Sequence, residues 1–337
     1  MRVLLTGVGC PGAHALISNL KLQDKDIFIL GTNANEQAIG RWLCDDFAVV
    51  PWAYEENYVD SIINLIKKNN IDIVFPQTSW EMFYLSKSAK EIEKHCRLLA
   101  SKHELVAICE NKYLMYKHFE GKIDVPEFYL VKTLAELVKA AEKLGYPEKD
   151  VVFKPPEGKG ARGVRVMTEK SNRYELLFDG RPFAKYISMD ELKSTVGERE
   201  IPELMVMEYL DGVELKIDPV LKDGDMLTCS VKNRLNFASG LAMGFEMIED
   251  NNALEYAKKL LTHLPMDYCI DISTRGGMLM EINPRVSTYI YGENYCAPYL
   301  SLKLAMGEMS AEDVRSFQNE LPIGKKMFRY YGQIDYY

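Results

Sequence analysis

Short apolar runs alternate with helix-type patterns through the first hundred residues. The segments Arg2–Thr6, Ile27–Leu30 and Ile71–Phe75 are apolar runs of the length expected for buried strands. Between them, the apolar residues of 58–66 recur on one side of a helix. Strands that alternate with helices predict a parallel sheet covered on both faces, with ligands bound where the strands end.

Four polar residues follow the end of one predicted strand. They come directly after Pro76, which stops the apolar run, and they are Gln77, Thr78, Ser79 and Glu81. Threonine and serine are preferred at helix N-caps. This segment therefore supplies either substrate contacts or helix caps, and the sequence leaves both interpretations open.

A glycine-rich loop is expected between two strands near the middle of the chain. It follows Lys154, and its glycines and cations are Gly158, Lys159, Gly160, Arg162 and Gly163. Glycines let a loop close over a polyphosphate without Cβ clashes, and the cations and main-chain N–H groups neutralise its charge. Lys154 would aim a further charge at the same phosphates. The spacing is not that of a Walker loop, and a hairpin without a ligand is the alternative.

A strand-to-linker segment with binding potential is expected next. An apolar strand over 204–208 leads into the sequence Glu208-Tyr209-Leu210-Asp211-Gly212-Val213-Glu214. Free main-chain groups at such a hinge can read an adenine edge, and Glu214 can accept hydrogen bonds from ribose hydroxyls.

A long hairpin is expected to follow this segment. Residues 222–225 read Lys-Asp-Gly-Asp, a strong turn signature between strands. On the second strand Lys232 and Arg234 share a face, a spacing more typical of a solvated stripe than of a site.

The segment 279–285, Leu-Met-Glu-Ile-Asn-Pro-Arg, has the pattern of a metal-binding strand end. In a strand, Glu281 and Asn283 project from the same face, and their oxygens suit Mg²⁺. Asp271 lies across a hairpin that we expect to turn through the three residues 275–277, which makes it the partner of Glu281. A two-residue turn would put Asp271 on the opposite face. Arg285 adds a permanent cation beside the expected metal.

The composition is that of a globular protein that does not bind nucleic acid. The chain has 337 residues and a net charge of −8, which argues against a nucleic-acid surface. Its seven cysteines show no metal-finger spacing and indicate reduced thiols. With no leader pattern and no apolar run near about 20 residues, we expect a cytoplasmic protein without membrane contact.

The first predicted strand is followed by a literal G-x-G-x-x-G at residues 7–12. Such a turn can bring main-chain N–H groups to an anion. The acid that would hold a dinucleotide ribose is missing after the next strand, where Gly31-Thr32-Asn33 stands and Glu36 is the nearest acid. A glycine turn that packs helix on sheet is therefore favoured over an NAD-linked oxidoreductase.

In their order, these motifs resemble the ATP-grasp superfamily, in particular its carbamoyl-phosphate-synthetase-like and biotin-carboxylase-like branch. The resemblance implies an α/β fold, with α+β character towards the C-terminus. It also implies four parts: a Rossmann-like pre-ATP-grasp domain (1–100), a connector and N-terminal ATP-grasp lobe with a glycine lid (101–205), a C-terminal lobe with the metal site (206–325) and a tail (326–337).

The resemblance also implies roles for individual residues. Lys112 and Lys154 would contact phosphates together with the glycine loop. The backbone around Tyr209, from Glu208 to Leu210, would hold adenine, and Glu214 the ribose. The metal ligands would be Asp271, Glu281 and Asn283, while Arg285 and Arg234 would face phosphate or substrate.

Two features depart from the family pattern. Cys269 stands where some ligases carry an arginine before the first metal acid, and this places more weight on Arg285. The interval between Asp271 and Glu281 is also short, so Asp271 is the least secure metal ligand.

The sequence thus predicts an ATP- and Mg²⁺- (or Mn²⁺-) dependent ligase that joins a small-molecule carboxylate to an amine through an acyl-phosphate. Bicarbonate activation, or nucleotide binding without catalysis, are the alternatives. Assembly as a homodimer is left open.

Overall fold

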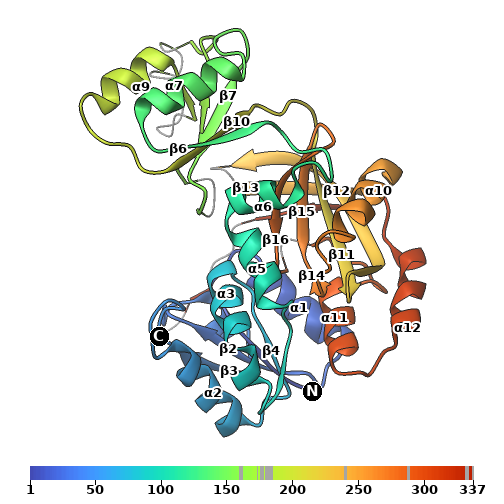
Figure 1. Ribbon diagram of the computed structural model, residues 1–337. Helices are drawn as coiled ribbons and strands as arrows, with labels where there is room; N and C mark the ends of the chain where they lie inside the picture. The colour runs from blue at the N-terminus through green and yellow to red at the C-terminus, as the bar shows by residue number, and fades with distance from the viewer. Residues whose placement is uncertain are drawn as a thin grey trace. The chain divides into compact units, whose positions relative to one another are not determined.

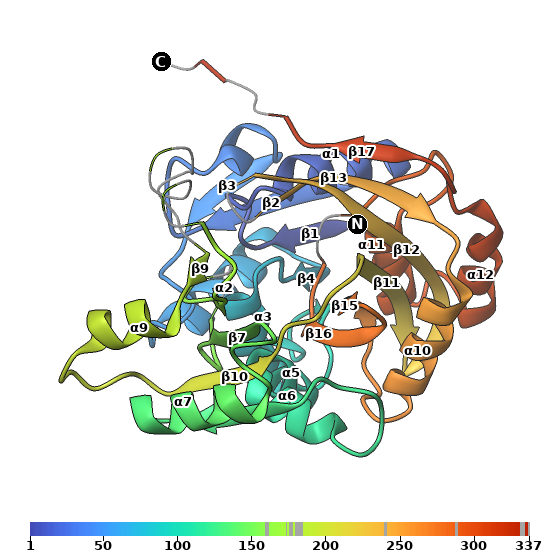
Figure 2. The ribbon, with the colours of Figure 1, turned by 90° about the horizontal axis from the view of Figure 1, so that it is seen from above.

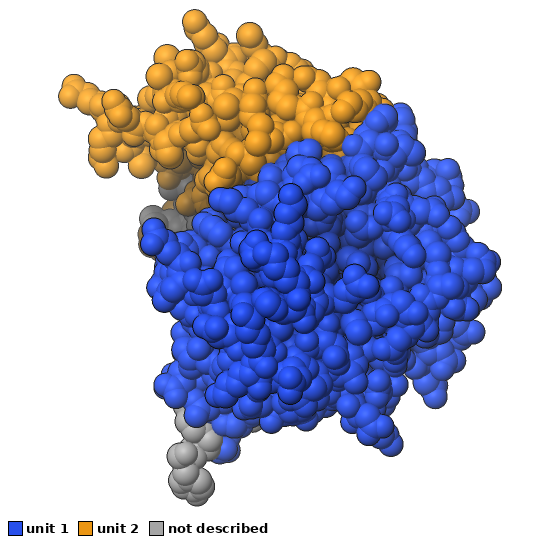
Figure 3. All heavy atoms as spheres, turned by 60° about the horizontal axis from the view of Figure 1, so that its bottom comes forward, with its two compact units in different colours: residues 1–110, 214–237, 242–337 blue, residues 111–213, 238–241 orange. Residues whose placement is uncertain are grey.

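The computed structural model describes residues 1–158, 162–172, 174, 178, 185–238, 241–286, 289–330 and 334–335 (Figure 1). The chain forms two compact units, coloured separately in Figure 3. Unit 1 contains residues 1–110, 214–237 and 242–337, and unit 2 contains residues 111–213 and 238–241. The expected segment 1–100 and most of the expected segment 206–325, namely residues 214–237 and 242–325, therefore fall in one compact unit.

The N-terminal part of unit 1 is a parallel five-stranded sheet in the order β3-β2-β1-β4-β5. Its strands are β1 (Arg2–Leu5), β2 (Phe28–Asn33), β3 (Asp46–Val49), β4 (Ile73–Phe75) and β5 (Arg97–Leu98). Its helices are α1 (Ala13–Gln23), η1 (Ile39–Trp42), α2 (Tyr58–Asn69), α3 (Ser79–Lys87) and α4 (Ala89–Ile92).

Alternation along β1 explains why helices cover both faces of this sheet. Val3 and Leu5 belong to the core that contains α1, whereas Leu4 belongs to the core that contains α2. The predicted parallel sheet with helices on both faces is therefore confirmed.

The rest of unit 1 is built around an antiparallel sheet in the order β16-β15-β11-β12-β13-β17, with β14 also paired to β11 (Figure 2). The strands are β11 (Glu214–Lys222), β12 (Asp225–Ala238), β13 (Leu241–Ile248), β14 (Tyr268–Cys269), β15 (Asp271–Arg275), β16 (Met278–Asn283) and β17 (Lys326–Phe328). The helices are α5 (His103–Glu110), α10 (Asn251–Leu261), α11 (Ala297–Ala305), α12 (Ala311–Ser316) and η2 (Phe317–Glu320).

Two details of this sheet bear on the sequence analysis. Asp223 and Gly224, with φ of 51° and 82°, form the predicted turn between β11 and β12. Residues 326–328, expected to belong to a tail, instead pair with β13 as β17.

Val220 and Leu300 from this part share a core with Val3 of the parallel sheet, so one apolar core joins both sheets of unit 1.

Unit 2 contains a five-stranded sheet in the order β6-β10-β7-β8-β9. Its strands are β6 (Phe128–Val131), β7 (Val151–Lys154), β8 (Arg165–Met167), β9 (Tyr186–Ile187) and β10 (Leu204–Glu208). Its helices are α6 (Lys112–Phe119), α7 (Leu134–Lys143) and α9 (Met189–Val196). Thr133 and Glu136 form a capping box at the start of α7. Antiparallel β7 and β8 flank the glycine-rich loop, as predicted.

Among the helices that the structure describes, none is long and apolar enough to cross a bilayer.

Candidate functional site

One face of the antiparallel sheet in unit 1 carries a row of polar and charged side chains. Strand residues alternate between faces, so the register of β11, β12, β15 and β16 decides which side chains meet there. The members of this charged face are Glu214, Lys216, Asp218, Lys232, Arg234, Asp271, Ser273, Arg275, Glu281 and Asn283.

The hairpin of β15 and β16 brings Asp271 to this face through an irregular register. The turn consists of the two residues 276–277 and not of the three-residue loop that we expected. A two-residue turn alone would have put Asp271 on the opposite face. A bulge at Met280 adds one residue to β16 and restores the shared face. The partner of Asp271 is consequently Asn283 and not, as expected, Glu281.

The three predicted metal ligands converge on one point of the charged face. Nδ2 of Asn283 donates to Oδ1 of Asp271 at 3.0 Å and to Oε1 of Glu281 at 3.3 Å. Asp271 is fully buried, and its Oδ2 atom has no hydrogen-bond partner among the described residues. The side chain of Glu281, by contrast, is 41% exposed. One carboxylate is thus fixed inside the sheet, and the other faces outward.

The donor chemistry of this group fits Mg²⁺, which prefers hard oxygen ligands. Oδ2 of Asp271 and the carboxylate of Glu281 offer such oxygens, and a rotated Asn283 amide would present a third. Within the described part of the chain, no group of three or more His, Cys, Asp or Glu side chains could hold a metal ion. A metal here would therefore need the amide of Asn283, or further oxygens from water or phosphate.

Lys216 reaches the same point from the central strand β11, and the sequence analysis missed it. Its Nζ atom lies 2.8 Å from Oδ1 of Asp271 and 3.7 Å from Oε1 of Glu281. Lys216 also donates to Oγ of Ser273, its cross-strand partner. The signal was the alternation Glu-Leu-Lys at 214–216, which places Lys216 on the face of Glu214.

Lys232 does not belong to a solvated stripe, as its spacing suggested, because it is fully buried and paired with Asp218. Burial raises the pKa of Asp218 to about 7, although the Lys232 ammonium opposes the change. Burial acts to raise the pKa of Asp271 as well, but Lys216 and Lys232 outweigh it and hold that pKa below 3.8. Asp271 is therefore ionised at neutral pH.

Glu214, the expected ribose ligand, lies between two guanidinium groups. Nη2 of Arg275 donates to its Oε2 atom at 2.8 Å, and Arg234 donates to its Oε1 atom. The side chain of Glu214 is only 6% exposed. Arg234, which was expected to contact phosphate or substrate, thus forms an ion pair with Glu214. The sequence had indicated only a turn position for Arg275, the second partner of Glu214. The ribose role of Glu214 stays a prediction.

Arg285 connects the end of β16 with the parallel sheet of unit 1. Its Nε atom donates to Oγ of Ser79 at 3.0 Å, and Nη1 donates to the carbonyl of Val286 at 2.9 Å. Ser79 is the first residue of α3, directly after β4. Thr78 caps this helix by accepting from the N–H of Glu81 at 3.4 Å. The cap interpretation is confirmed for Thr78. Ser79 contacts a candidate site residue, and contact of this segment with a substrate stays a prediction.

The glycine turn at 7–12 packs against the protein's own carboxylate. Gly7 has φ of +64°, and a Cβ atom there would lie 2.6 Å from Oε2 of Glu81. That oxygen accepts hydrogen bonds from Thr6 at 2.8 Å and Thr78 at 2.7 Å. Burial raises the pKa of Glu81, although the hydroxyls of Thr78 and Thr6 and the N–H of Gly7 favour its ionised form. The close packing of Gly7 agrees with the interpretation that we favoured for G-x-G-x-x-G.

In unit 2, Lys112 is attached to the base of the glycine-rich loop. Its Nζ atom donates to the carbonyl of Gly158 at 2.8 Å, and its main-chain N–H donates to the carbonyl of Pro156 at 2.8 Å. Lys154 is buried on β7, with Nζ 5.5 Å from the ring centroid of Tyr116. The structure therefore places both predicted phosphate-binding lysines around the strand that enters the loop.

The other loop residues divide into two groups. Gly163 has φ of +74°, a conformation that favours glycine, and Arg162 is exposed. Lys159 and Gly160 were also predicted to bind phosphate, and they lie outside the described residues.

The predicted adenine segment is partly engaged within unit 2. The main-chain N–H of Glu208 donates to the carbonyl of Glu127 at 3.1 Å, and its Oε2 atom accepts from the N–H of Glu127 at 2.8 Å. Leu210 is buried and Tyr209 is half-buried. The N–H of Glu208 thus extends the sheet pairing, and adenine binding by the backbone from Glu208 to Leu210 stays a prediction.

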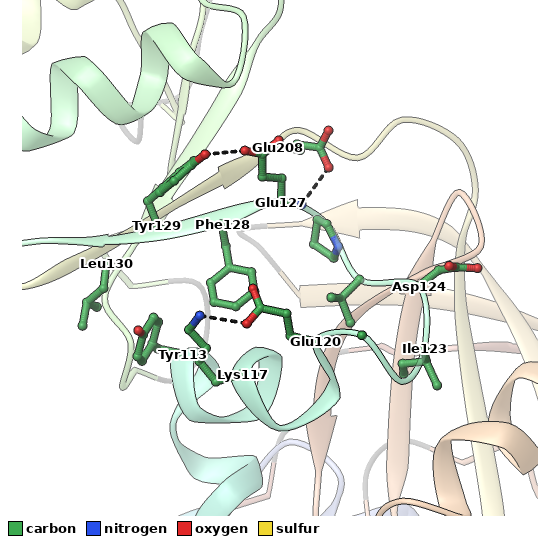
Figure 4. Close-up of a pocket in the computed structure, with 13 residues that line it drawn as sticks. Tyr113, Lys117, Glu120, Ile123, Asp124, Glu127, Phe128, Tyr129, Leu130 and Glu208 are labelled. Carbon is green, nitrogen blue, oxygen red and sulfur yellow. Dashed lines mark hydrogen bonds and ion pairs between the residues drawn. The ribbon is translucent and has the colours of Figure 1, made fainter.

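A cavity of about 870 Å³ lies beside α6 and β6 in unit 2 (Figure 4). Glu208 lines it, together with Lys117 and Glu120, whose side chains form an ion pair at 2.8 Å. Neither Lys112 nor Lys154 belongs to its lining. This cavity is therefore not the space in which those lysines were predicted to hold phosphates.

Two family models match the chain. A model described as ATP-grasp in the biosynthetic pathway with Ter operon matches residues 200–325, and a model of the PylC-like N-terminal domain matches residues 3–99. Residues 200–325 thus carry the match to the ATP-grasp superfamily, and the two models together support the resemblance that the motifs indicated. The first match contains the hairpin of β15 and β16, with its three predicted metal ligands, and Arg285. The predicted metal-binding segment 279–285 therefore lies within the part of the chain that the ATP-grasp model matches.

Several solved structures share the fold of this chain. N5-carboxyaminoimidazole synthetase from Staphylococcus aureus, complexed with ADP, has a TM-score of 0.66 at 13% identity, over 92% of this chain and 78% of that chain. Biotin carboxylase from Campylobacter jejuni has a TM-score of 0.64 at 14% identity, over 93% and 72%. The L-amino acid ligase from Bacillus licheniformis has a TM-score of 0.61 at 15% identity, over 93% and 77%.

No curated protein sequence matches this chain. The predicted fold, a Rossmann-like domain followed by an ATP-grasp domain, is confirmed.

Proposed function

We propose that this ATP-grasp protein is an ATP- and Mg²⁺-dependent ligase that joins a carboxylate to an amine through an acyl-phosphate. A carboxylate oxygen attacks the γ-phosphorus of ATP, and the bond to the β,γ-bridging oxygen breaks, so that ADP leaves. The amine nitrogen then attacks the acyl carbon, phosphate leaves, and the nitrogen loses a proton. Two of the structural neighbours are complexes with ADP, which supports the choice of nucleotide.

The observation that carries the proposal is the convergence of Asp271, Glu281 and Asn283 on the charged face. These three residues would hold Mg²⁺, which neutralises phosphate oxygens when it is bound. The rigid sheet provides the positioning, because all three side chains project from paired strands whose register is fixed by hydrogen bonds.

Arg285 is the residue that we propose to stabilise charge on the substrate. Arg285 follows Pro284 just after the end of β16, the strand that carries Glu281 and Asn283. Its side chain is oriented by Oγ of Ser79 and the carbonyl of Val286. A guanidinium stays charged at all working pH values and can donate two parallel hydrogen bonds to an acyl-phosphate or an oxyanion. Since catalysis would rest on positioning and charge stabilisation, no general base is nominated.

The contact with Ser79 also indicates where the carboxylate would bind. The loop between β4 and α3 lies at the carboxyl end of a parallel strand, the usual ligand-binding edge of such a sheet. Gln77 belongs to this loop, and Ser79 is the first residue of the helix that follows it. We therefore place the acceptor carboxylate between this loop and Arg285, within unit 1.

The test is ADP release by the purified chain with ATP and Mg²⁺, against a panel of carboxylate–amine pairs and, separately, bicarbonate. An ¹⁸O label in the accepted carboxylate should appear in the released phosphate, because the acyl C–O bond breaks in the second step. ADP release that requires bicarbonate alone would favour bicarbonate activation instead. Nucleotide binding without ADP release for any acceptor would overturn the proposal in favour of a non-catalytic binding protein.

A further inference from the structure

Lys216 places a permanent cation between the two acids of the expected metal site. Its Nζ atom lies 2.8 Å from Oδ1 of Asp271 and 3.7 Å from Oε1 of Glu281, and it also donates to Oγ of Ser273. In this position Nζ contacts one oxygen of each carboxylate, as a bridging metal ion would.

The surroundings hold this ammonium in place. Lys216 is 8% exposed and Ser273 is 1% exposed, and the two residues are cross-strand partners in the middle of the sheet. A buried ammonium is tolerated only when nearby acids compensate for its lost hydration. Asp271 provides this compensation, whereas the neighbouring Lys232 is paired with Asp218.

When all its acids are ionised, the charges of the charged face balance without any metal. Its acids are Glu214, Asp218, Asp271 and Glu281, and its cations are Lys216, Lys232, Arg234 and Arg275. Without Lys216, the face would carry an excess negative charge, centred on Asp271 and Glu281. An additional cation would then be needed at the position that Nζ occupies.

We propose that Lys216 is a built-in substitute for one of two divalent cations, so that this enzyme binds ATP with a single Mg²⁺. Lys216 stays paired with Oδ1 of Asp271, and the single ion is held by Glu281 and Asn283 together with Oδ2 of Asp271. The inference rests on the proposed function, because it concerns the metal site of that reaction.

The test counts bound Mn²⁺ by electron paramagnetic resonance at saturating β,γ-imido-ATP. The wild-type chain should bind about one Mn²⁺, and Lys216→Gln, which removes the charge but keeps a polar side chain, should bind about two. Two ions on the wild-type chain would overturn this inference alone. Failure of the wild-type chain to bind either nucleotide or Mn²⁺ would instead overturn the proposed function.

A second measurement does not depend on nucleotide or activity. Lys216→Met leaves Asp271 and Glu281 without their ammonium, so its melting temperature should fall in EDTA and recover when Mg²⁺ is added. Lys232→Met is the matched control, because it removes the cross-strand neighbour of Lys216 on the same face. Its melting temperature should fall without recovery. If Mg²⁺ also fails to restore Lys216→Met, the lysine is only a structural partner and the inference is wrong.

Discussion

Nε of Arg285 donates to Oγ of Ser79 at 3.0 Å, although 206 positions of sequence separate the two residues. The contact joins the end of β16 in the antiparallel sheet to the start of α3 beside the parallel sheet. Both residues belong to unit 1. A candidate catalytic cation is thus oriented by the loop in which we expect the substrate carboxylate to bind.

Ser79→Ala should lower kcat for ADP release while the chain stays folded. The variant removes one hydrogen bond to a charged group, which corresponds to roughly a tenfold loss if Arg285 loses its orientation. Arg285→Gln removes the charge itself and should cost about 10²–10³ in kcat. Arg315→Gln, at a partly exposed arginine paired with Asp225, is the control. Equal rates in all three variants would exclude the role of Arg285.

Glu281→Gln should reduce ADP formation by ~10³-fold or more, because an amide is a weaker ligand for Mg²⁺ than a carboxylate. The Mg²⁺ concentration that gives half-maximal rate should rise in the same variant. Glu91→Gln is the matched control, since Glu91 forms an exposed ion pair with Lys94. Unchanged turnover of Glu281→Gln would rule out its assignment as a metal ligand.

Lys112→Met should raise the KM for ATP by about ten- to a hundredfold, the range expected for the loss of a charge-assisted hydrogen bond. The effect has two sources: a lost phosphate contact and the lost bond to the carbonyl of Gly158. Steady-state kinetics with ATP as the varied substrate measures it. Lys117→Met, on the same helix, removes only the pair with Glu120 and should leave KM unchanged. A normal KM in Lys112→Met would contradict the assignment.

Glu81 should make stability decrease as pH rises. Burial raises its pKa above the ordinary value of 4.5, so the folded chain binds this proton more tightly than the unfolded chain does. The stability that the protonated Glu81 side chain contributes is therefore fully present below pH 4.5 and is lost as pH rises through the raised pKa of this group. The side chain of Glu81→Gln cannot ionise. The melting temperature of this variant should therefore rise relative to that of the wild type as pH increases over this range. A difference that stays constant with pH would show that Glu81 keeps its ordinary pKa.

The local sequence pattern was sufficient to predict several helices, strands and turns and part of the candidate site. Alternation of side chains between faces put Glu281 and Asn283 on one side of β16. Glycine and aspartate at 223–224 fixed the turn of the long hairpin, and the capping box fixed the start of α7. Each of these depends on residues only a few positions apart, which is why the sequence by itself determined them.

Tertiary structure decided the rest. The bulge at Met280 determined the face on which Asp271 lies, because strand register depends on how two whole strands pack and not on spacing within one. The partners of Lys216 and Lys232 were decided in the same way, by pairing across β11. The contact between Arg285 and Ser79 exists only because one apolar core joins both sheets of unit 1. The sequence by itself thus selected the types of residue for the site, and the packing of distant strands decided which of them meet.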